Sequence, residues 1–161
     1  MKVRVAAAAA FAALLAAGGA AGALFQSPNG EATVSLSSAA AGARDVGLTA
    51  QIPTVLQCGR PTGLPVALSL PRGVRMPGAI PLSAVRVNGV QASKVVVANR
   101  VVTVTLPVHR GITCFALIEG KLKIAIAPSA SLGNPSSAGT YTFGIRQGRT
   151  AYAVPVTIKP A

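Results

Sequence analysis

The sequence has few of the residues on which catalysis and metal binding depend. Its 161 residues include three carboxylates, Glu31, Asp45 and Glu119, one histidine, His109, and two cysteines. General acid–base catalysis needs two titratable groups held close together with displaced pKa values. An electron-transfer copper site needs two histidines and a cysteine. We therefore expect no catalytic residue, no metal site and no cofactor.

Aromatic residues are also scarce, at 4% of the chain, and tryptophan is absent. Proteins that bind single-stranded nucleic acid stack the bases on aromatic side chains, so nucleic acid is not an expected partner. The core must be built from the aliphatic residues that supply most of the 51% apolar content. Twelve prolines and seventeen glycines favour many turns over long helices. A chain of this length suits one domain.

The first 25 residues, MKVRVAAAAAFAALLAAGGAAGALF, carry Lys2 and Arg4 before a long uncharged run. This pattern, ending in small residues, predicts a signal peptide over residues 1–23. We expect an exported protein, either secreted or associated with the cell envelope. The alternative is a retained membrane anchor, because about 20 apolar residues can span a bilayer. Only in that case would the membrane itself be a partner.

Export also decides how the two cysteines are interpreted. A single pair in an oxidising compartment predicts a disulfide between Cys58 and Cys114. Closing this loop would restrict the unfolded chain by about 4 kcal/mol. The alternative is a small exported thiol enzyme in which Cys114 is the nucleophile, with His109 and Glu119 nearby in sequence. The spacing of the two cysteines is not that of a CxxC redox motif.

Residues 24–44 are rich in Ser, Ala and Gly and predict a linker that contributes at most one edge strand. From Asp45 onward, short apolar alternations separated by turns predict an antiparallel β-sandwich over residues 45–161, with about seven to nine strands. Turns are expected at Asn88–Gly89, Ala98–Asn99 and Gly148. The residues predicted to face the core are Val46, Leu48, Ala50, Ile52, Val66, Leu68, Leu70, Val85, Val87, Val102, Val104, Leu106, Leu122, Ile124, Ile126, Tyr141, Phe143, Ile145, Tyr152, Val154, Val156 and Ile158.

Gly139 stands two residues before Tyr141 at the start of a late strand, a spacing similar to the tyrosine corner of immunoglobulin-like sandwiches. The chain from about Asp45 onward resembles the bacterial extracellular immunoglobulin-like domains of surface and envelope-associated proteins. The resemblance rests on this spacing and on the stretches LSLPRGVRMP, VRVNGV followed by VVTVTLP, and NPSSAGTYTF. The resemblance implies an immunoglobulin-like fold, with the last two strands as F and G, and a noncatalytic interaction or structural module. Phe143 stands where antibody-type domains have their second core cysteine. The two cysteines are therefore expected in loops at one end of the sandwich.

Positive charge is the remaining signal. The formal net charge is +12, and about +10 once Lys2 and Arg4 are removed with the signal peptide. Such a field attracts polyanions, and an anionic envelope polymer or a surface protein is the expected partner. The candidate anion-binding residues, all expected in loops, are Arg60, His109, Arg110, Arg146 and Arg149. The alternative is that the cations are scattered over the surface and serve solubility.

Overall fold

The computed structural model describes residues 31–53, 64–107 and 121–161. The predicted signal peptide, Cys58, Arg60, and the HRGITCFALIE stretch with His109, Arg110 and Cys114 lie outside these ranges. The predictions that rest on them, including the disulfide, stay predictions. Within the described ranges, no helix has the length and apolar character needed to cross a membrane.

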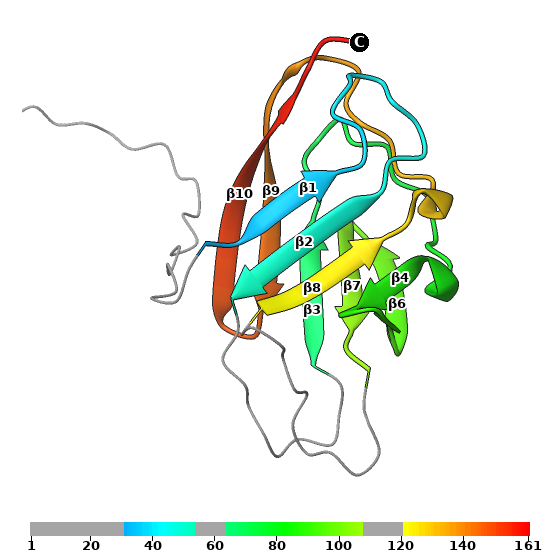
Figure 1. Ribbon diagram of the computed structural model, residues 1–161, viewed down its shortest axis with the longest axis vertical. Helices are drawn as coiled ribbons and strands as arrows, with labels where there is room; N and C mark the ends of the chain where they lie inside the picture. The colour runs from blue at the N-terminus through cyan, green and yellow to red at the C-terminus, as the bar shows by residue number, and fades with distance from the viewer. Residues whose placement is uncertain (1–30, 54–63, 108–120) are drawn as a thin grey trace, which may run out of the picture.

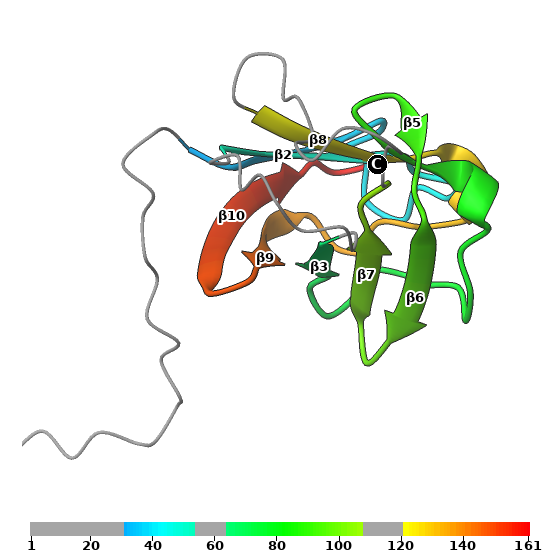
Figure 2. The same ribbon diagram turned by 90° about the horizontal axis from the view of Figure 1, so that it is seen from below.

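In the described ranges, ten strands form two antiparallel five-stranded sheets that pack face to face as a β-sandwich (Figures 1 and 2). The first sheet has the order β1-β2-β8-β4-β5, with β1 (Thr33–Leu36), β2 (Leu48–Pro53), β8 (Lys121–Ile126), β4 (Val85–Val87) and β5 (Val90–Gln91). The second has the order β10-β9-β3-β7-β6, with β10 (Thr150–Ile158), β9 (Gly139–Gln147), β3 (Pro65–Ser69), β7 (Val101–Thr105) and β6 (Lys94–Ala98). The only helical elements in the described ranges are the 3-10 turns η1 (Leu82–Ala84) and η3 (Pro128–Ala130). The predicted all-β antiparallel sandwich is confirmed.

The core lies between the two sheets and follows the predicted alternation. Val66, Val85, Val87, Val102 and Val104 are completely buried. The other predicted inward residues are buried as well, except for Tyr141, Tyr152 and Val156, which are partly buried and pack against the core. Burying each large aliphatic side chain contributes about 1.5–3 kcal/mol, so the aliphatic alternation supplies the main favourable term that holds the two sheets together.

Two tight turns of the hairpin type fix the register of the strands that they join. Asn88 and Gly89 join β4 to β5 with positive φ angles of 47° and 84°, as predicted. In the β6–β7 hairpin the turn lies at Asn99–Arg100, with φ of 47° and 65°, one residue later than predicted. Positive φ at both central residues matches a type I′ turn, which suits the twist of the strands it joins.

Arg100 accepts this unusual conformation because its side chain is bound. The guanidinium donates to the carbonyl oxygens of Leu70 at 3.3 Å and Val74 at 2.8 Å, and also to that of Pro71. The backbone carbonyl of Arg100 accepts the N–H of Leu70 at 2.9 Å. The proline-containing segment that follows β3 is therefore attached to the tip of the β6–β7 hairpin.

Part of the predicted linker belongs to the sandwich. Strand β1 pairs with β2 at the sheet edge, and residues 37–43, here called the strap, run on along the end of the domain. The N–H of Ala41 donates to Lys159 O at 2.8 Å, and the N–H of Lys159 donates to Ala39 O at 2.7 Å. Backbone hydrogen bonds hold the strap, and these leave no pattern of side chains in the sequence. Strand β1 is the one edge strand that the linker prediction allowed, and the attachment of the strap that follows it could not be predicted from the sequence.

Asn134 fixes the strap from the other side. Its side chain is buried, with 7% exposed, and its amide nitrogen donates to Ser38 O at 2.9 Å and to Ala40 O at 2.8 Å. Its backbone N–H donates to Ala43 O at 2.9 Å. One side chain therefore ties the connection before β9 to the segment that follows β1.

The strand order agrees with an immunoglobulin sandwich in part. The neighbours β1-β2-β8-β4 and β10-β9-β3 correspond to the ABED and GFC sheets, with β9 and β10 as F and G. The β6–β7 hairpin extends the second sheet beside β3, but in the chain it follows β4 rather than preceding it. The immunoglobulin-like assignment therefore stays a prediction. The ten strands exceed the expected seven to nine because β1 and the two-residue β5 are too short to give a clear alternation.

Candidate functional site

The two described members of the predicted anion-binding group lie near one another at one end of the sandwich. Arg149 is in the two-residue turn between β9 and β10, and Arg146 lies three residues before it, on β9 rather than in a loop. The Arg146 side chain is exposed and its Nε donates to Gly148 O at 3.3 Å. Gly148 has φ of 58°, which places it in the turn as predicted.

At this end of the sandwich, the lower one in Figure 1, the described ranges end at residues 53 and 107 and begin again at residues 64 and 121. Pro53 pairs with Lys121 in the first sheet, and Leu106 N–H donates to Leu64 O at 3.0 Å beside the second. Lys121 adds a third exposed cation here. The remaining members of the group, Arg60, His109 and Arg110, lie outside the described residues, so their association with Arg146 and Arg149 stays a prediction.

A second candidate site, which the sequence did not predict, lies on the outer face of the first sheet. The strand register places Ser35, Thr49, Ala125 and Arg86 in one row across β1, β2, β8 and β4. Side chains two residues apart share a face, so all four point away from the core. Ala125 is the small member of the row, and the surface dips between Thr49 and Arg86.

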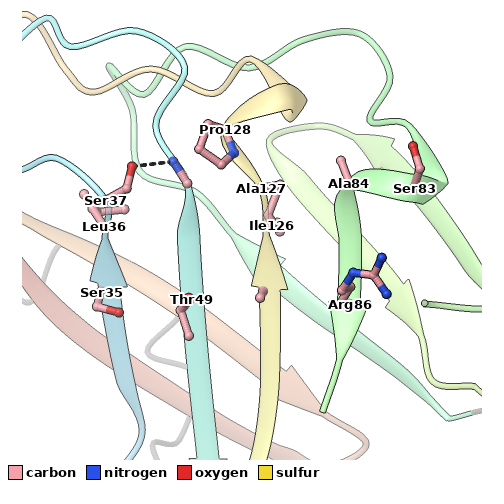
Figure 3. Close-up of a pocket in the computed structure, with 12 residues that line it drawn as sticks. Ser35, Leu36, Ser37, Thr49, Ser83, Ala84, Arg86, Ile126, Ala127 and Pro128 are labelled. Atoms are coloured by element: carbon pink, nitrogen blue, oxygen red, sulfur yellow. Dashed lines mark hydrogen bonds between the residues drawn. The ribbon is translucent and has the colours of Figure 1, made fainter. Parts of the chain in front are cut away.

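The dip is part of a shallow hollow of about 370 Å³, here called the outer-face hollow (Figure 3). Its lining is formed by Ser35, Leu36, Ser37, Gly47, Thr49, Ser83, Ala84, Arg86, Ala125, Ile126, Ala127 and Pro128. Figure 3 shows Ser35 and Thr49 on one side, and Arg86 with Ser83 on the other. The Ser37 hydroxyl oxygen accepts the N–H of Gly47 at 2.8 Å, which fixes the rim of the hollow.

The chemistry of this lining suits binding rather than catalysis. Arg86 donates one N–H to Gly89 O at 3.2 Å and is exposed, so most of its five donors face solvent. Hydroxyl groups can donate to the same ligand, and no carboxylate lines the hollow. Lys123 lies on the same face, one row away beside Gln51. The arrangement can bind an anionic group that also carries hydroxyl or ester oxygens.

Tyr141 lies at the start of β9, where the tyrosine-corner expectation placed it. Its hydroxyl donates to Ser137 O at 2.9 Å, in the connection that precedes the strand. Gly139 has φ of 153° and begins β9 opposite Ile158. This contact orders the entry to β9 and is structural in character.

No group of three or more metal-binding side chains occurs among the residues that the structure describes. Glu31 and Asp45 are the two carboxylates in those ranges, and neither lines the outer-face hollow. The thiol-enzyme alternative rests on Cys114, His109 and Glu119, all outside the described residues.

Comparisons with known proteins give no family. Neither a protein-family model nor a curated protein matches the sequence. Among solved structures, the crystal structure of BslA, described as a bacterial hydrophobin, is similar with a TM-score of 0.47 and 20% sequence identity. The similarity covers 81% of this chain and 96% of that chain.

Proposed function

We propose that this protein is an exported, noncatalytic module that binds an anionic polymer of the cell envelope through the outer face of its first sheet. The observation that carries the proposal is the row Ser35, Thr49, Ala125 and Arg86 with the hollow that it surrounds. The predicted signal peptide supports an extracellular location, and the resemblance to immunoglobulin-like envelope domains supports a module without catalysis.

The charge distribution supports an anionic partner. Beside Arg86, the same face carries Lys121 and Lys123 on β8, and its outward positions on β1 and β2 include Thr, Ser and Gln residues. Cations and hydroxyl groups together form charge-assisted hydrogen bonds with phosphate or carboxylate oxygens. A polymer that repeats such groups can follow the face across several strands.

The test measures binding of the protein to defined polymers. It compares a variant that loses two positive charges in the proposed site with a control variant that loses two positive charges elsewhere on the surface. Long-chain polyphosphate and polygalacturonate serve as probes, and neutral dextran as the blank, in a salt series. The site variant is Arg86→Gln with Lys123→Gln. The control is Arg72→Gln with Lys159→Gln, which removes the same charge from exposed positions elsewhere.

We expect the site variant to lower the affinity about tenfold and the control to lower it about twofold or less, because only the first pair would contact the polymer directly. Equal losses in the two variants would reduce the binding to nonspecific attraction by net charge. Binding that is absent for both anionic polymers in wild type would refute the proposal.

A further inference from the structure

The two sheets of the described residues have four edges, and three of these edges are protected against pairing with another strand. Strand β5 is two residues long and β1 is four. Strand β10 is long, but Pro155 stands in its middle. Gln147 and Thr150 close the β9–β10 hairpin as a hydrogen-bonded pair, and hydrogen-bonded pairs alternate along the ladder. The pair of Thr142 and Pro155 is therefore not hydrogen-bonded, and the backbone of Pro155 faces the open side of the sheet. Its missing N–H removes a donor from that edge.

Strand β6 is the fourth edge and has no such protection. It ends the order β10-β9-β3-β7-β6 and lies at the outer side of its layer in Figure 2. Its sequence, KVVVA, has no proline or glycine, and its one charge, Lys94, is at the beginning. Exposed apolar edge strands of this kind readily pair with another strand.

The hairpin turn decides which backbone groups of β6 are available. Ala98 and Val101 close the two-residue turn and form a hydrogen-bonded pair, so Lys94, Val96 and Ala98 direct their backbone groups toward β7. Val95 and Val97 direct theirs toward the open side. No backbone hydrogen bond from a loop in the described ranges reaches either of them.

The exposure of the side chains also indicates that the β6 edge is uncovered. Val96 is the most exposed large apolar residue in the described ranges, with 43% of its surface accessible. It lies on the outer face of the second sheet, beside Thr103 of β7. Val95 and Val97 lie on the inner face and are only partly buried, because no further strand of the described residues covers them from the side.

We propose that β6 pairs with β6 of a second copy of this chain, antiparallel and centred on Val96. In this register Val95 of each copy lies opposite Val97 of the other. The free N–H and C=O groups of both residues are then satisfied by about four hydrogen bonds across the symmetry axis. The two five-stranded sheets become one continuous sheet, and the closed symmetry stops growth at the dimer.

Charge favours this register over its alternatives. Lys94 of one copy lies opposite Ala98 of the other, so the two lysines are at opposite ends of the paired strands. Their separation, about 13 Å along the strand direction, exceeds the screening length of ~8 Å at physiological salt. The net positive charge of each copy still opposes association. We therefore expect a weak dimer that becomes stronger as salt increases.

The test is sedimentation velocity of the exported protein over a range of concentrations, at ~0.05 M and ~0.5 M salt. Val96→Lys places two cations opposite each other at the symmetry axis. Thr103→Lys adds the same charge on the same face one strand inward and is the control. Val97→Pro removes a donor from the open side, as Pro155 does on β10. Circular dichroism confirms that each variant is folded.

We expect the wild type and Thr103→Lys to approach twice the monomer mass at high concentration, with tenfold tighter association or more at the higher salt. Val96→Lys and Val97→Pro should remain monomeric. A wild type that is monomeric at every salt overturns the proposal and leaves the edge to a strand of another protein. Association that weakens with salt, or that persists in folded Val96→Lys, also overturns it.

The outcome is independent of polymer binding. Val96→Lys should bind anionic polymers as well as wild type does, and Arg86→Gln with Lys123→Gln should dimerise normally. Polymer binding weakens with salt, whereas pairing of β6 strengthens, so each result identifies which of the two proposals has failed.

Discussion

Replacing Asn134 by alanine tests whether one buried amide holds the strap against the sandwich. The change removes the donors to Ser38 O and Ala40 O, at 2.9 and 2.8 Å. Each neutral hydrogen bond contributes about 0.5–1.5 kcal/mol net. The loss of both, at a site only 7% exposed, is expected to lower the free energy of unfolding by about 2 kcal/mol.

Urea denaturation measures this loss. For a small protein the dependence of the unfolding free energy on urea is about 1–3 kcal/mol per molar, so the midpoint should fall by roughly 1 M with an unchanged slope. Ser136→Ala, at an exposed position two residues away, is the matched control and should shift the midpoint little.

Hydrogen exchange adds a local measurement. The N–H groups of Ala41 and Gly42 donate to Lys159 O and Pro135 O across the strap. They should exchange faster in Asn134→Ala than global unfolding alone explains, because the strap can open by itself. Amides of the core strand β8 should report only the global change.

Asn134→Asp sharpens the test because it keeps the shape of the side chain. An ionised carboxylate has no donor and would face two carbonyl oxygens, so the aspartate variant should be less stable than the alanine variant at pH 7. The protonated acid can donate one hydrogen bond and the carbonyl oxygens favour it in the folded protein, so this difference should shrink as the pH falls toward about 4 and stay constant below it. If Asn134→Ala unfolds within about 0.3 kcal/mol of wild type, the two hydrogen bonds do not hold the strap.

Two further predictions rest on single contacts of the fold, and a third rests on the predicted disulfide. Arg100→Lys keeps the charge but removes the planar guanidinium that donates to three carbonyl oxygens. It should lower the free energy of unfolding by about 1–2 kcal/mol, measured as a lower urea midpoint. An unchanged midpoint would show that the guanidinium contacts are dispensable. Tyr141→Phe removes the hydrogen bond to the connection before β9 and should cost about 1 kcal/mol in the same assay, whereas a neutral or stabilising effect would contradict a tyrosine-corner role. Thiol titration of the denatured, unreduced protein should detect no free thiol if Cys58 and Cys114 are bonded, and two thiols would refute the disulfide.

The sequence predicted the sandwich because burial repeats with the period of the strand. In KLKIAI, for example, Leu122, Ile124 and Ile126 are buried, and both lysines are exposed. The Asn88–Gly89 turn was equally local, since both residues tolerate positive φ. The β6–β7 turn was placed one residue early because an arginine at φ of 65° has no local reason to occur. Its reason is the set of carbonyl groups around Leu70, thirty residues earlier in the chain.

The candidate site was harder to predict than the fold. Ser35, Thr49, Arg86 and Ala125 are ordinary outward residues of four separate strands, and only the register of β1, β2, β8 and β4 brings them into one row. Positive charge in predicted loops points to Arg146 and Arg149 but not to Arg86, which is in a strand. Residues that a sheet brings together from distant segments leave no spacing to find in one sequence.

The contact between the strap and Lys159 has a mechanical consequence. Ala40 and Lys159 form a parallel bridge, whereas all strand pairs of the two sheets are antiparallel. Tension applied between the segment before the strap and the segment after β10 would pull these two parallel stretches in opposite directions. The hydrogen bonds of Ala41 and Lys159 are then loaded together in shear and must break together, instead of opening one after another. In a protein pulled at both ends this small patch, secured by Asn134, resists the load in shear and contributes to the lifetime of the sandwich under load, since forced unfolding is governed by the unfolding rate.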